Sequence, residues 1–325
     1  MAERAALAAR VNGHPLIAAA TGALAGEPVS AVGGVVRDAL LGVEPGGEVD
    51  LVVEGDALEL ARALARRLGG EVELHPRFGT AEVTIGGGRI DIVGARSERY
   101  PAPGALPEVR PGTLEDDLAR RDFTVNAMAY GLSGPRAGDF MDPHGGLADL
   151  DRRLLRTLRP GSFREDPSRL VRAARYIARL GMSLAPELAP EARAAARDLD
   201  LRSARVADEL ARLLDERAAG VAMEALADLG VPWAAPGAPA AIAAVDGAWA
   251  TGGAPPLPLW ALRAGAAIAP AALEDAALPG WALTLARQVR AGAGLVPELR
   301  AAGSRSAVDA VLRRARRRRG AGRRR

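Results

Sequence analysis

The sequence predicts an α+β head followed by an all-helical region, and two features of its hydrophobic pattern carry this prediction. Short apolar strands and amphipathic helices alternate over about the first 150 residues, as in a mixed sheet covered by helices. From Ser162 onward Arg, Leu and Ala recur at helical spacing. At 325 residues the chain is longer than one typical core, so we expect more than one domain.

The elements of the head follow one another along the chain. Residues 29–34 form a short apolar strand that ends in a glycine pair, and a helical pattern follows at 35–41. Residues 51–53 predict a second strand, and 57–68 predict an amphipathic helix that Gly69 terminates. The remaining expectations are strands at 71–74, 81–85 and 90–93, a Pro- and Gly-rich loop at 100–113 and an apolar helical run at 123–130.

Four segments are expected: a head at 1–150, a helical neck at 151–230, a small helical body at 231–312 and an Arg-rich disordered tail at 313–325. The tail holds nine Arg and no acidic residue, and without it the chain has 34 Arg against 40 acidic residues, a net charge of −6. The basic balance of the chain therefore belongs largely to the tail. Such a tail is either a solvated end or a non-specific contact for nucleic-acid phosphates.

The composition excludes several kinds of site. The sequence has no cysteine, which excludes disulfides, thiolate metal sites and cysteine nucleophiles. Its three histidines lie far apart, which argues against a zinc site. No charge-free apolar run reaches about 18 residues and no signal-peptide pattern begins the chain, so we expect a cytoplasmic protein that does not enter a membrane. No segment indicates an obligate protein partner.

The glycine pair Gly33–Gly34 lies between the first strand and the first helix of the head. Glycine lets the backbone approach a ligand closely, and the amides of a first helical turn attract anions. Arg37, one turn later, could add a cation for a triphosphate. Many strand–turn–helix joints carry two glycines, so this feature alone fits an ordinary turn equally well.

An acidic pair, Glu48 and Asp50, lies just ahead of the apolar residues 51–53. Residues two apart on a strand point to the same face, so both carboxylates could hold Mg²⁺, or they could form a solvated polar edge. Asp91 opens another apolar stretch and is a third candidate carboxylate. Metal ions in such a site could activate a hydroxyl and neutralise a departing pyrophosphate.

Together with ordered motifs further along, this region resembles the family of bacterial and eukaryotic CCA-adding enzymes and poly(A) polymerases. The resemblance covers roughly residues 29–215. It rests on residues 33–50, on RFGTA at 77–81, on Asp91 with ARSERY at 95–100, on DLARRDFTVNAMA at 117–129, on DPHGG at 142–146 and on EDPSR at 165–169. The resemblance implies a polymerase-β-like nucleotidyltransferase head followed by helical neck and body regions.

In two respects the sequence departs from the family pattern. The family usually has Asp at both acidic positions, whereas the first is Glu48 here, and the loop before it is one residue longer. Mg²⁺ requires near-octahedral geometry at about 2.0–2.1 Å, so the extra methylene bears on metal binding. The longer loop could absorb the shift.

The resemblance also implies how the nucleotide is bound. Arg121 and Asp122 are expected to contact the ribose, with Asn126 supporting them one helical turn later, and Asp166 and Arg169 are expected to read the base. A carboxylate accepts from the exocyclic amine of C or A and a guanidinium donates to the adjacent ring nitrogen, whereas U and G present the opposite pattern. Arg172 and Arg175 recur on the same helical face, either as a solvated stripe or turned toward the triphosphate.

The function implied is template-independent, Mg²⁺-dependent addition of C and/or A from CTP and ATP to the 3′ end of tRNA. A bacterial poly(A) polymerase shares the motifs and is the nearest alternative. The loop at 100–113 resembles one that helps the family change from C to A, which favours an enzyme able to add A. A different class of function is a catalytically silent tRNA-binding relative in which Glu48 has broken the metal site.

Overall fold

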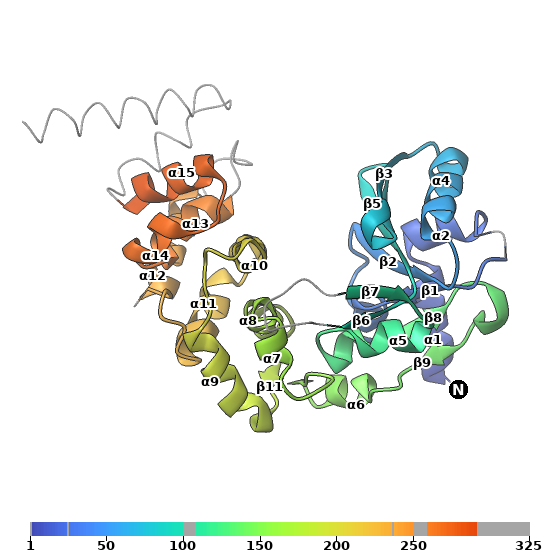
Figure 1. The fold of residues 1–325 in the computed structure, drawn as a ribbon, viewed down its shortest axis with the longest axis horizontal. Helices are drawn as coiled ribbons and strands as arrows, with labels where there is room; N and C mark the ends of the chain where they lie inside the picture. Colours follow the sequence, from blue (N-terminus) through green and yellow to red (C-terminus); the bar gives the residue numbers. More distant parts are fainter. Residues whose placement is uncertain (1, 25, 100–107, 236, 250–258, 291–325) are drawn as a thin grey trace, which may run out of the picture. The chain divides into compact units, whose positions relative to one another are not determined.

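The computed structural model describes the chain apart from residues 1, 25, 100–107, 236, 250–258 and 291–325 (Figure 1). The chain divides into two compact units, Met1–Glu165 and Asp166–Arg325, called here the head unit and the helical unit. The expected order, an α+β head before a helical region, is confirmed. The boundaries expected at 150, 230 and 312 stay predictions, and the tail at 313–325 lies outside the described residues.

The head unit is built on a seven-stranded sheet with strand order β3-β4-β5-β2-β1-β8-β9. β2 and β5 run parallel, and the other neighbouring strands are antiparallel, so the sheet is mixed as expected. The strands are β1 (Val29–Val32), β2 (Glu48–Val53), β3 (Glu71–His75), β4 (Thr80–Ile85), β5 (Gly88–Gly94), β8 (Ala129–Gly131) and β9 (Phe140–Met141).

Helices and shorter strands complete the head unit. The helices are α1 (Ala2–Asn12), α2 (Pro15–Thr21), α3 (Gly34–Leu41), α4 (Ala57–Leu68), α5 (Leu114–Ala119), α6 (Gly146–Asp151) and α7 (Ser162–Glu165). A separate hairpin joins β6 (Arg96–Arg99) to β7 (Glu108–Pro111), and β10 is Leu154–Leu155. Three 3₁₀ turns lie at Pro76–Phe78, Thr124–Asn126 and Gly134–Arg136.

The two faces of the sheet differ in polarity because side chains alternate along each strand. One face is apolar: Leu51, Ile90, Ile92 and Val83 are fully buried, and α2 and α4 pack on these strands. Helix α4 begins at the cap residue Asp56, whose carboxylate accepts two backbone N–H groups.

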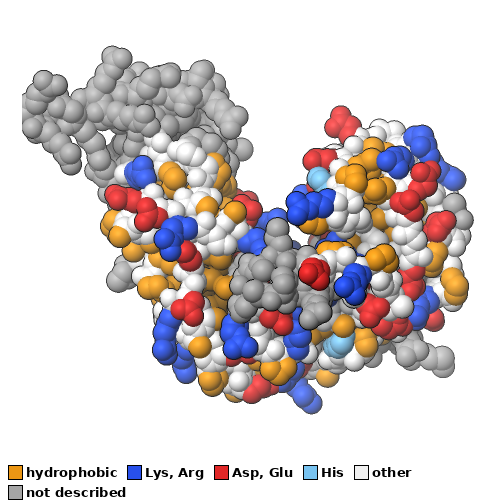
Figure 2. All heavy atoms as spheres, in the orientation of Figure 1, with side chains coloured by type: hydrophobic (Ala, Val, Ile, Leu, Met, Phe, Trp, Pro, Cys, Tyr) orange, Lys and Arg blue, Asp and Glu red, His pale blue; other side chains and the backbone are white. Residues whose placement is uncertain are grey.

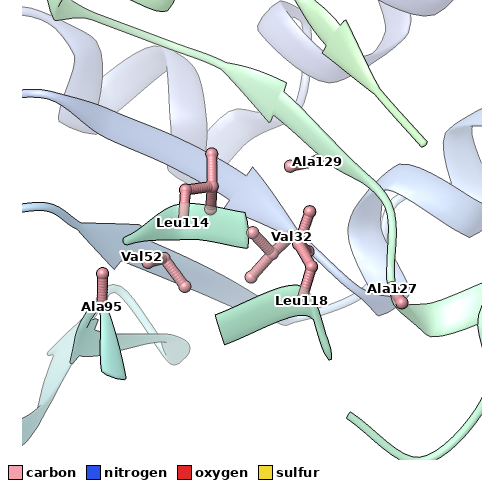
Figure 3. Close-up of a cluster of buried hydrophobic side chains, with 7 residues drawn as sticks. All are labelled: Val32, Val52, Ala95, Leu114, Leu118, Ala127 and Ala129. Carbon is pink, nitrogen blue, oxygen red and sulfur yellow. The ribbon is translucent and has the colours of Figure 1, made fainter. Parts of the chain in front are cut away.

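The opposite face of the sheet is only partly covered. Helix α5 packs on it beside β2, in a cluster of buried side chains drawn in Figure 3. Its members are Val32, Val52, Ala95, Leu114, Leu118, Ala127 and Ala129. Two residues before Val52, on the same face of β2, lies Asp50, so the polar part of the face begins where this cluster ends.

The expectation of a helical run at 123–130 is wrong. The segment forms a 3₁₀ turn at Thr124–Asn126 and then β8, whose Ala129 pairs with Val32 of β1. Phe123, Val125 and Met128 are fully buried. In an apolar run that is buried on all sides, polar and apolar residues do not alternate with a helical or strand period, so the pattern cannot distinguish a helix from a central strand. Part of the expected loop at 100–113 is also strand β7, and residues 100–107 lie outside the described residues.

The helical unit packs its helices around buried Ala and Leu side chains. Helix α8 contacts α10 and α11, while α13 contacts α10, α12 and α15. The elements are α8 (Ser168–Leu180), β11 (Ser183–Leu184), a 3₁₀ turn (Pro186–Leu188), α9 (Ala189–Arg197), α10 (Ala204–Asp215), α11 (Ala219–Asp228), α12 (Ala238–Trp249), α13 (Leu259–Ala267), α14 (Pro270–Asp275) and α15 (Gly280–Arg290).

Charges of both signs cover the described surface. On the face that Figure 2 presents, Arg and acidic side chains are interspersed over each unit. Among the described helices, none has the length and apolar character needed to cross a membrane.

Candidate active site

The glycine turn between β1 and α3 has the strained geometry that only glycine adopts readily. Gly33 has φ +70° and ψ −125°, and its N–H donates to the Met128 carbonyl at 3.2 Å. A Cβ on Gly33 would lie 2.8 Å from Nη1 of Arg121 and 3.5 Å from Oδ2 of Asp50. Gly34 is the first residue of α3. The turn therefore lies directly beside two predicted site residues, Asp50 and Arg121.

The three predicted carboxylates lie on neighbouring strands. Glu48 and Asp50 both belong to β2, and the parallel register pairs Asp50 directly with Asp91 of β5. Glu82 of β4 pairs with Asp91 from the other side and was missed in the sequence, because only the register of β4 and β5 reveals it. We call these four carboxylates the acidic face; alternation places all of them on one side of the sheet.

The electrostatics of the acidic face are set by burial and by two arginines, Arg121 beside Asp50 and Arg89 beside Asp91. Burial raises the pKa of Asp50, and it raises the pKa of Asp91 to about 6. Arg89, also on β5, lies 2.9 Å from Oε1 of Glu48, and its Nε lies 3.5 Å from Asp91 and 3.6 Å from Glu82. This guanidinium opposes the rise in the pKa of Asp91. The contact of Arg89 with these carboxylates could not be predicted from the sequence, because it depends on the register of β2 and β5.

The acidic face has the chemistry of a divalent-cation site. Mg²⁺ is commonly held by one or two carboxylates together with substrate phosphates, and the register sets Asp50 and Asp91 side by side for that purpose. Within the described ranges, no group of three or more His, Cys, Asp or Glu side chains converges as a ready-made metal site. Two neighbouring carboxylates are the number that Mg²⁺ commonly takes from a protein when substrate phosphates supply further oxygens.

Arg121 is held in place by the buried Asp117. Its Nε and Nη2 donate to Oδ2 of Asp117 at 3.3 and 3.0 Å, and the Asp117 side chain is fully buried. Asp117 also accepts from Arg120, at 2.6 and 2.9 Å. Since Asp117 holds one side of the Arg121 guanidinium, Nη1 is directed toward the glycine turn.

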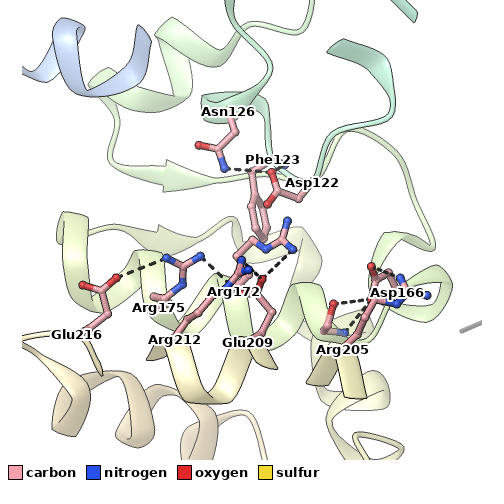
Figure 4. Close-up of polar contacts among 11 residues, drawn as sticks. Asp122, Phe123, Asn126, Asp166, Arg172, Arg175, Arg205, Glu209, Arg212 and Glu216 are labelled. Atoms are coloured by element: carbon pink, nitrogen blue, oxygen red, sulfur yellow. Dashed lines mark hydrogen bonds and ion pairs between the residues drawn. The ribbon is translucent and has the colours of Figure 1, made fainter. Parts of the chain in front are cut away.

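Asp122, Asn126 and Arg37 form a buried chain of hydrogen bonds. Nδ2 of Asn126 donates to Oδ1 of Asp122 at 3.0 Å (Figure 4), and Oδ1 of Asn126 accepts from Nη1 of Arg37 at 2.6 Å. Arg37 is only 2% exposed and also donates to Asp38 at 2.8 Å. Asn126 reaches Asp122 through a 3₁₀ turn and not through the helix expected, and the role of both residues at the ribose stays a prediction. The expected contact of Arg37 with phosphate stays a prediction, because its guanidinium braces Asn126 here.

Asp166 accepts hydrogen bonds from Ser168, the first residue of helix α8, and pairs with Arg205, whose role could not be predicted from the sequence. Its Oδ1 accepts from the backbone N–H of Ser168 at 3.1 Å and from the Ser168 hydroxyl at 2.6 Å. Its Oδ2 lies 2.7 Å from Nη1 of Arg205 on α10 (Figure 4). Asp166 is 8% exposed and Arg169 is 4% exposed, so both base-reading candidates are fixed and largely shielded from solvent.

The arginine stripe of α8 faces acidic residues of the next helices. Arg172 and Arg175 contact the two carboxylate oxygens of Glu209 at 3.1 and 3.4 Å, and Arg175 also lies 3.5 Å from Glu216 (Figure 4). Glu209 is 4% exposed and accepts from Arg212 as well, at 3.2 Å. The stripe is therefore packed against α10, which differs from the solvated alternative.

The structure thus assembles the predicted residues in two groups. Those of the head unit are Gly33, Gly34, Arg37, Glu48, Asp50, Asp91, Arg121, Asp122 and Asn126, and those of the helical unit are Asp166, Arg169, Arg172 and Arg175. Each group is held by hydrogen bonds and ion pairs within its own unit.

The chain is similar in sequence to known nucleotidyltransferases. Residues 29–156 match the poly A polymerase head domain. The chain is 47% identical over 212 residues to the CC-adding tRNA nucleotidyltransferase of Deinococcus radiodurans, which covers 64% of this chain and 55% of the relative. It is 52% identical over 153 residues to the A-adding tRNA nucleotidyltransferase of Aquifex aeolicus. These residues make up 47% of this chain and 18% of that relative. The chain spans about half or less of the length of these curated relatives.

Solved structures extend the similarity beyond the head. A tRNA-processing enzyme in an apo form is 31% identical with a TM-score of 0.64, over 83% of this chain and 79% of that one. A tRNA nucleotidyltransferase complexed with a primer tRNA and an incoming ATP analog is 28% identical with a TM-score of 0.66, over 85% and 84%.

Proposed function

Because this chain belongs to the family of CCA-adding tRNA nucleotidyltransferases and poly(A) polymerases, we propose that it adds C, A or both to the 3′ end of tRNA, using CTP and ATP. One structural observation carries the proposal: the register of β2 and β5 sets Asp50 beside Asp91 next to the glycine turn. Relatives named for CC addition and for A addition both support it, so the proposal leaves open which of the two nucleotides is added.

In the proposed reaction the 3′-hydroxyl of the RNA attacks the α-phosphorus of the incoming nucleotide. The new O–P bond forms as the bond to pyrophosphate breaks, and the hydroxyl proton passes to water. A divalent cation, which we propose to be Mg²⁺, lowers the pKa of that hydroxyl and offsets the charge of the leaving pyrophosphate. Asp50 and Asp91, together with Glu48, would supply the carboxylate oxygens for it.

The remaining residues of the head unit bind and orient the nucleotide in this proposal. The backbone amides of the first turn of α3, from Gly34 onward, bind phosphate oxygens, while Gly33 shapes the turn and keeps its N–H on the Met128 carbonyl. Arg121 and Asp122 contact the ribose, and the chain through Asn126 to Arg37 holds Asp122 in position. An Arg–Asp pair suits a ribose because its hydroxyls both donate and accept.

The helical unit selects the base in this proposal. Asp166 accepts from the exocyclic amine of C or A, and Arg169 donates to the neighbouring ring nitrogen. The hydrogen bonds from Ser168 and Arg205 hold the Asp166 carboxylate in one orientation, so U or G would set an acceptor against this carboxylate and a donor against the Arg169 guanidinium. Each such mismatch costs about 1–3 kcal/mol, and two give roughly 10²- to 10⁴-fold rejection of U and G.

The experiment uses tRNA transcripts that end before CCA, after C or after CC. Each is incubated with the protein, Mg²⁺ and labelled CTP or ATP, and product lengths are measured on a sequencing gel. Addition that stops within CCA supports the proposal, and the pattern separates CC addition, A addition and complete addition. Long A tails would instead indicate a poly(A) polymerase. Binding of tRNA without incorporation would indicate a silent relative.

We further propose that the protein works in the cytoplasm, where tRNA, CTP and ATP are present together. No obligate protein partner is part of the proposal.

A further inference from the structure

Arg89 lies among the carboxylates that are expected to hold the cation. Its guanidinium is within ion-pair distance of Glu48, Glu82 and Asp91, at 2.9, 3.6 and 3.5 Å. Its backbone N–H is bound to the Gly47 carbonyl at 2.8 Å, so the strand fixes where the side chain starts. About a third of the Arg89 side chain is exposed, which leaves it room to move toward solvent.

The departure of Glu48 from the family pattern has an explanation in this contact. The parallel register pairs Glu48 with Arg89 and Asp50 with Asp91. Glutamate is one methylene longer than aspartate. Among the three carboxylates within ion-pair distance of Arg89, that of Glu48 lies nearest to the guanidinium. The longer side chain is therefore matched to an arginine on the neighbouring strand.

At Asp91 and Glu82 the Arg89 guanidinium is held by charge, whereas its contact with Glu48 is short. Its Nε is buried but makes no hydrogen bond within the described part of the chain, since the nearest carboxylates lie at 3.5 and 3.6 Å. Nitrogen–oxygen hydrogen bonds are typically about 2.9 Å long. A cation held in this way can be displaced without breaking a well-formed hydrogen bond at Nε.

We propose that Arg89 occupies the acidic face when no divalent cation is bound and is displaced from Asp91 when a cation binds. Arg89 thereby lowers the cation affinity of the site and stabilises the cation-free protein. This inference rests on the proposed function, because it takes the acidic face to be the cation site of the nucleotidyltransferase. Arg89 is a positioning residue, since it acts through the carboxylates.

Arg89 and a divalent cation compete for the Asp91 carboxylate, and their positive charges repel each other. An Asp91 oxygen that faces the guanidinium has to turn toward the cation, so the ion pair and cation binding exclude each other there. Any positive charge left within a few ångströms also repels a divalent ion, and removing one such charge near a solvent-exposed site strengthens binding by roughly three- to tenfold. Without a cation, Arg89 offsets the repulsion among the clustered carboxylates.

The test measures cation binding without nucleotide or RNA. Mn²⁺ is titrated into the full-length protein, and free Mn²⁺ is followed by electron paramagnetic resonance for wild type, Arg89→Gln and Arg89→Lys. Thermal unfolding in EDTA is the second measurement. Arg136→Gln is the matched control, because Arg136 is equally exposed and contacts two acidic residues, Glu54 and Glu115, outside the acidic face.

The expected result is that Arg89→Gln binds Mn²⁺ about three- to tenfold more tightly and unfolds at a lower temperature in EDTA. Arg89→Lys keeps the charge and should stay near wild type, and Arg136→Gln should leave Mn²⁺ binding unchanged. Equal or weaker Mn²⁺ binding by Arg89→Gln would overturn the proposal. If Arg89→Gln binds Mn²⁺ more tightly but the wild-type protein adds no nucleotide to tRNA, the proposed function would be overturned and the effect of Arg89 on cation binding would remain.

Discussion

Replacing Gly33 with alanine adds one methyl group where the glycine turn meets Arg121. The backbone conformation, φ +70° and ψ −125°, costs an L residue about 1–3 kcal/mol. The new Cβ would also lie 2.8 Å from Nη1 of Arg121, which cannot simply swing away because Asp117 holds the other side of its guanidinium. We therefore expect Gly33→Ala to lose about 2–3 kcal/mol of unfolding free energy, combining strain with the lost Arg121 geometry.

Two assays test this prediction together. For a unit of this size about 1 kcal/mol corresponds to a shift of about 2–4 °C, so thermal unfolding should move down by about 5–10 °C. Displacing Arg121 by about 1 Å should lower nucleotide incorporation by about 10²-fold. Gly69→Ala is the control: Gly69 has φ +67°, and its Cβ would meet no described atom within 4 Å. That variant should lose about 1 kcal/mol and keep its activity. A Gly33→Ala protein with wild-type unfolding and incorporation would refute the reasoning.

Further predictions concern the acidic face, a helix cap and the helical unit. Asp91→Asn should raise the unfolding free energy of the metal-free protein at pH 7.5 by about 1–2 kcal/mol, allowing for partial exposure, because burial penalises the ionised carboxylate. The gain should disappear below about pH 4, where Asp91 is protonated in both states, and chemical denaturation at the two pH values checks it. Thr113→Ala removes the capping box of α5 and should cost about 1 kcal/mol in the same assay, and an unchanged midpoint would contradict it. Glu209→Gln leaves the α8 arginines facing a neutral amide and should lower the free energy of unfolding by about 2 kcal/mol in the same assay. An unchanged midpoint would show that these ion pairs do not stabilise the fold. Asp166→Asn should reduce the preference for CTP over UTP by at least about tenfold, and unchanged selectivity would exclude Asp166 from base reading.

Elements with a strong local pattern could be predicted from the sequence. Helix α4 occupies the expected residues, because an Asp cap, an amphipathic period and a terminal glycine all specify the same ends. The short apolar strands expected at 51–53 and 90–93 lie within β2 and β5, which begin two to three residues earlier. The helix expected at 123–130 failed because a fully buried apolar run carries no period, and its pairing with β1 is a long-range contact.

The composition of the site could be predicted better than its contacts. Asp50 and Asp91 were recognised separately, but their direct pairing depends on the register of β2 and β5. Arg89 stands two residues before Asp91, and nothing local shows that it meets Glu48 on another strand. Arg205 reaches Asp166 only because α10 packs against α8. Contacts of this kind arise from packing between segments that are distant in the chain.

One measurement tests the central claim directly, by following both parts of the nucleotide. A tRNA that lacks its 3′ CCA is incubated with the protein, Mg²⁺ and CTP, or with ATP after CC, labelled either at the α- or at the γ-phosphate. The account predicts that α label enters the RNA and γ label appears in pyrophosphate, one for one, and that Asp50→Asn abolishes both. Label that remains in the nucleotide with wild-type protein, or transfer that is equal in Asp50→Asn, would contradict it.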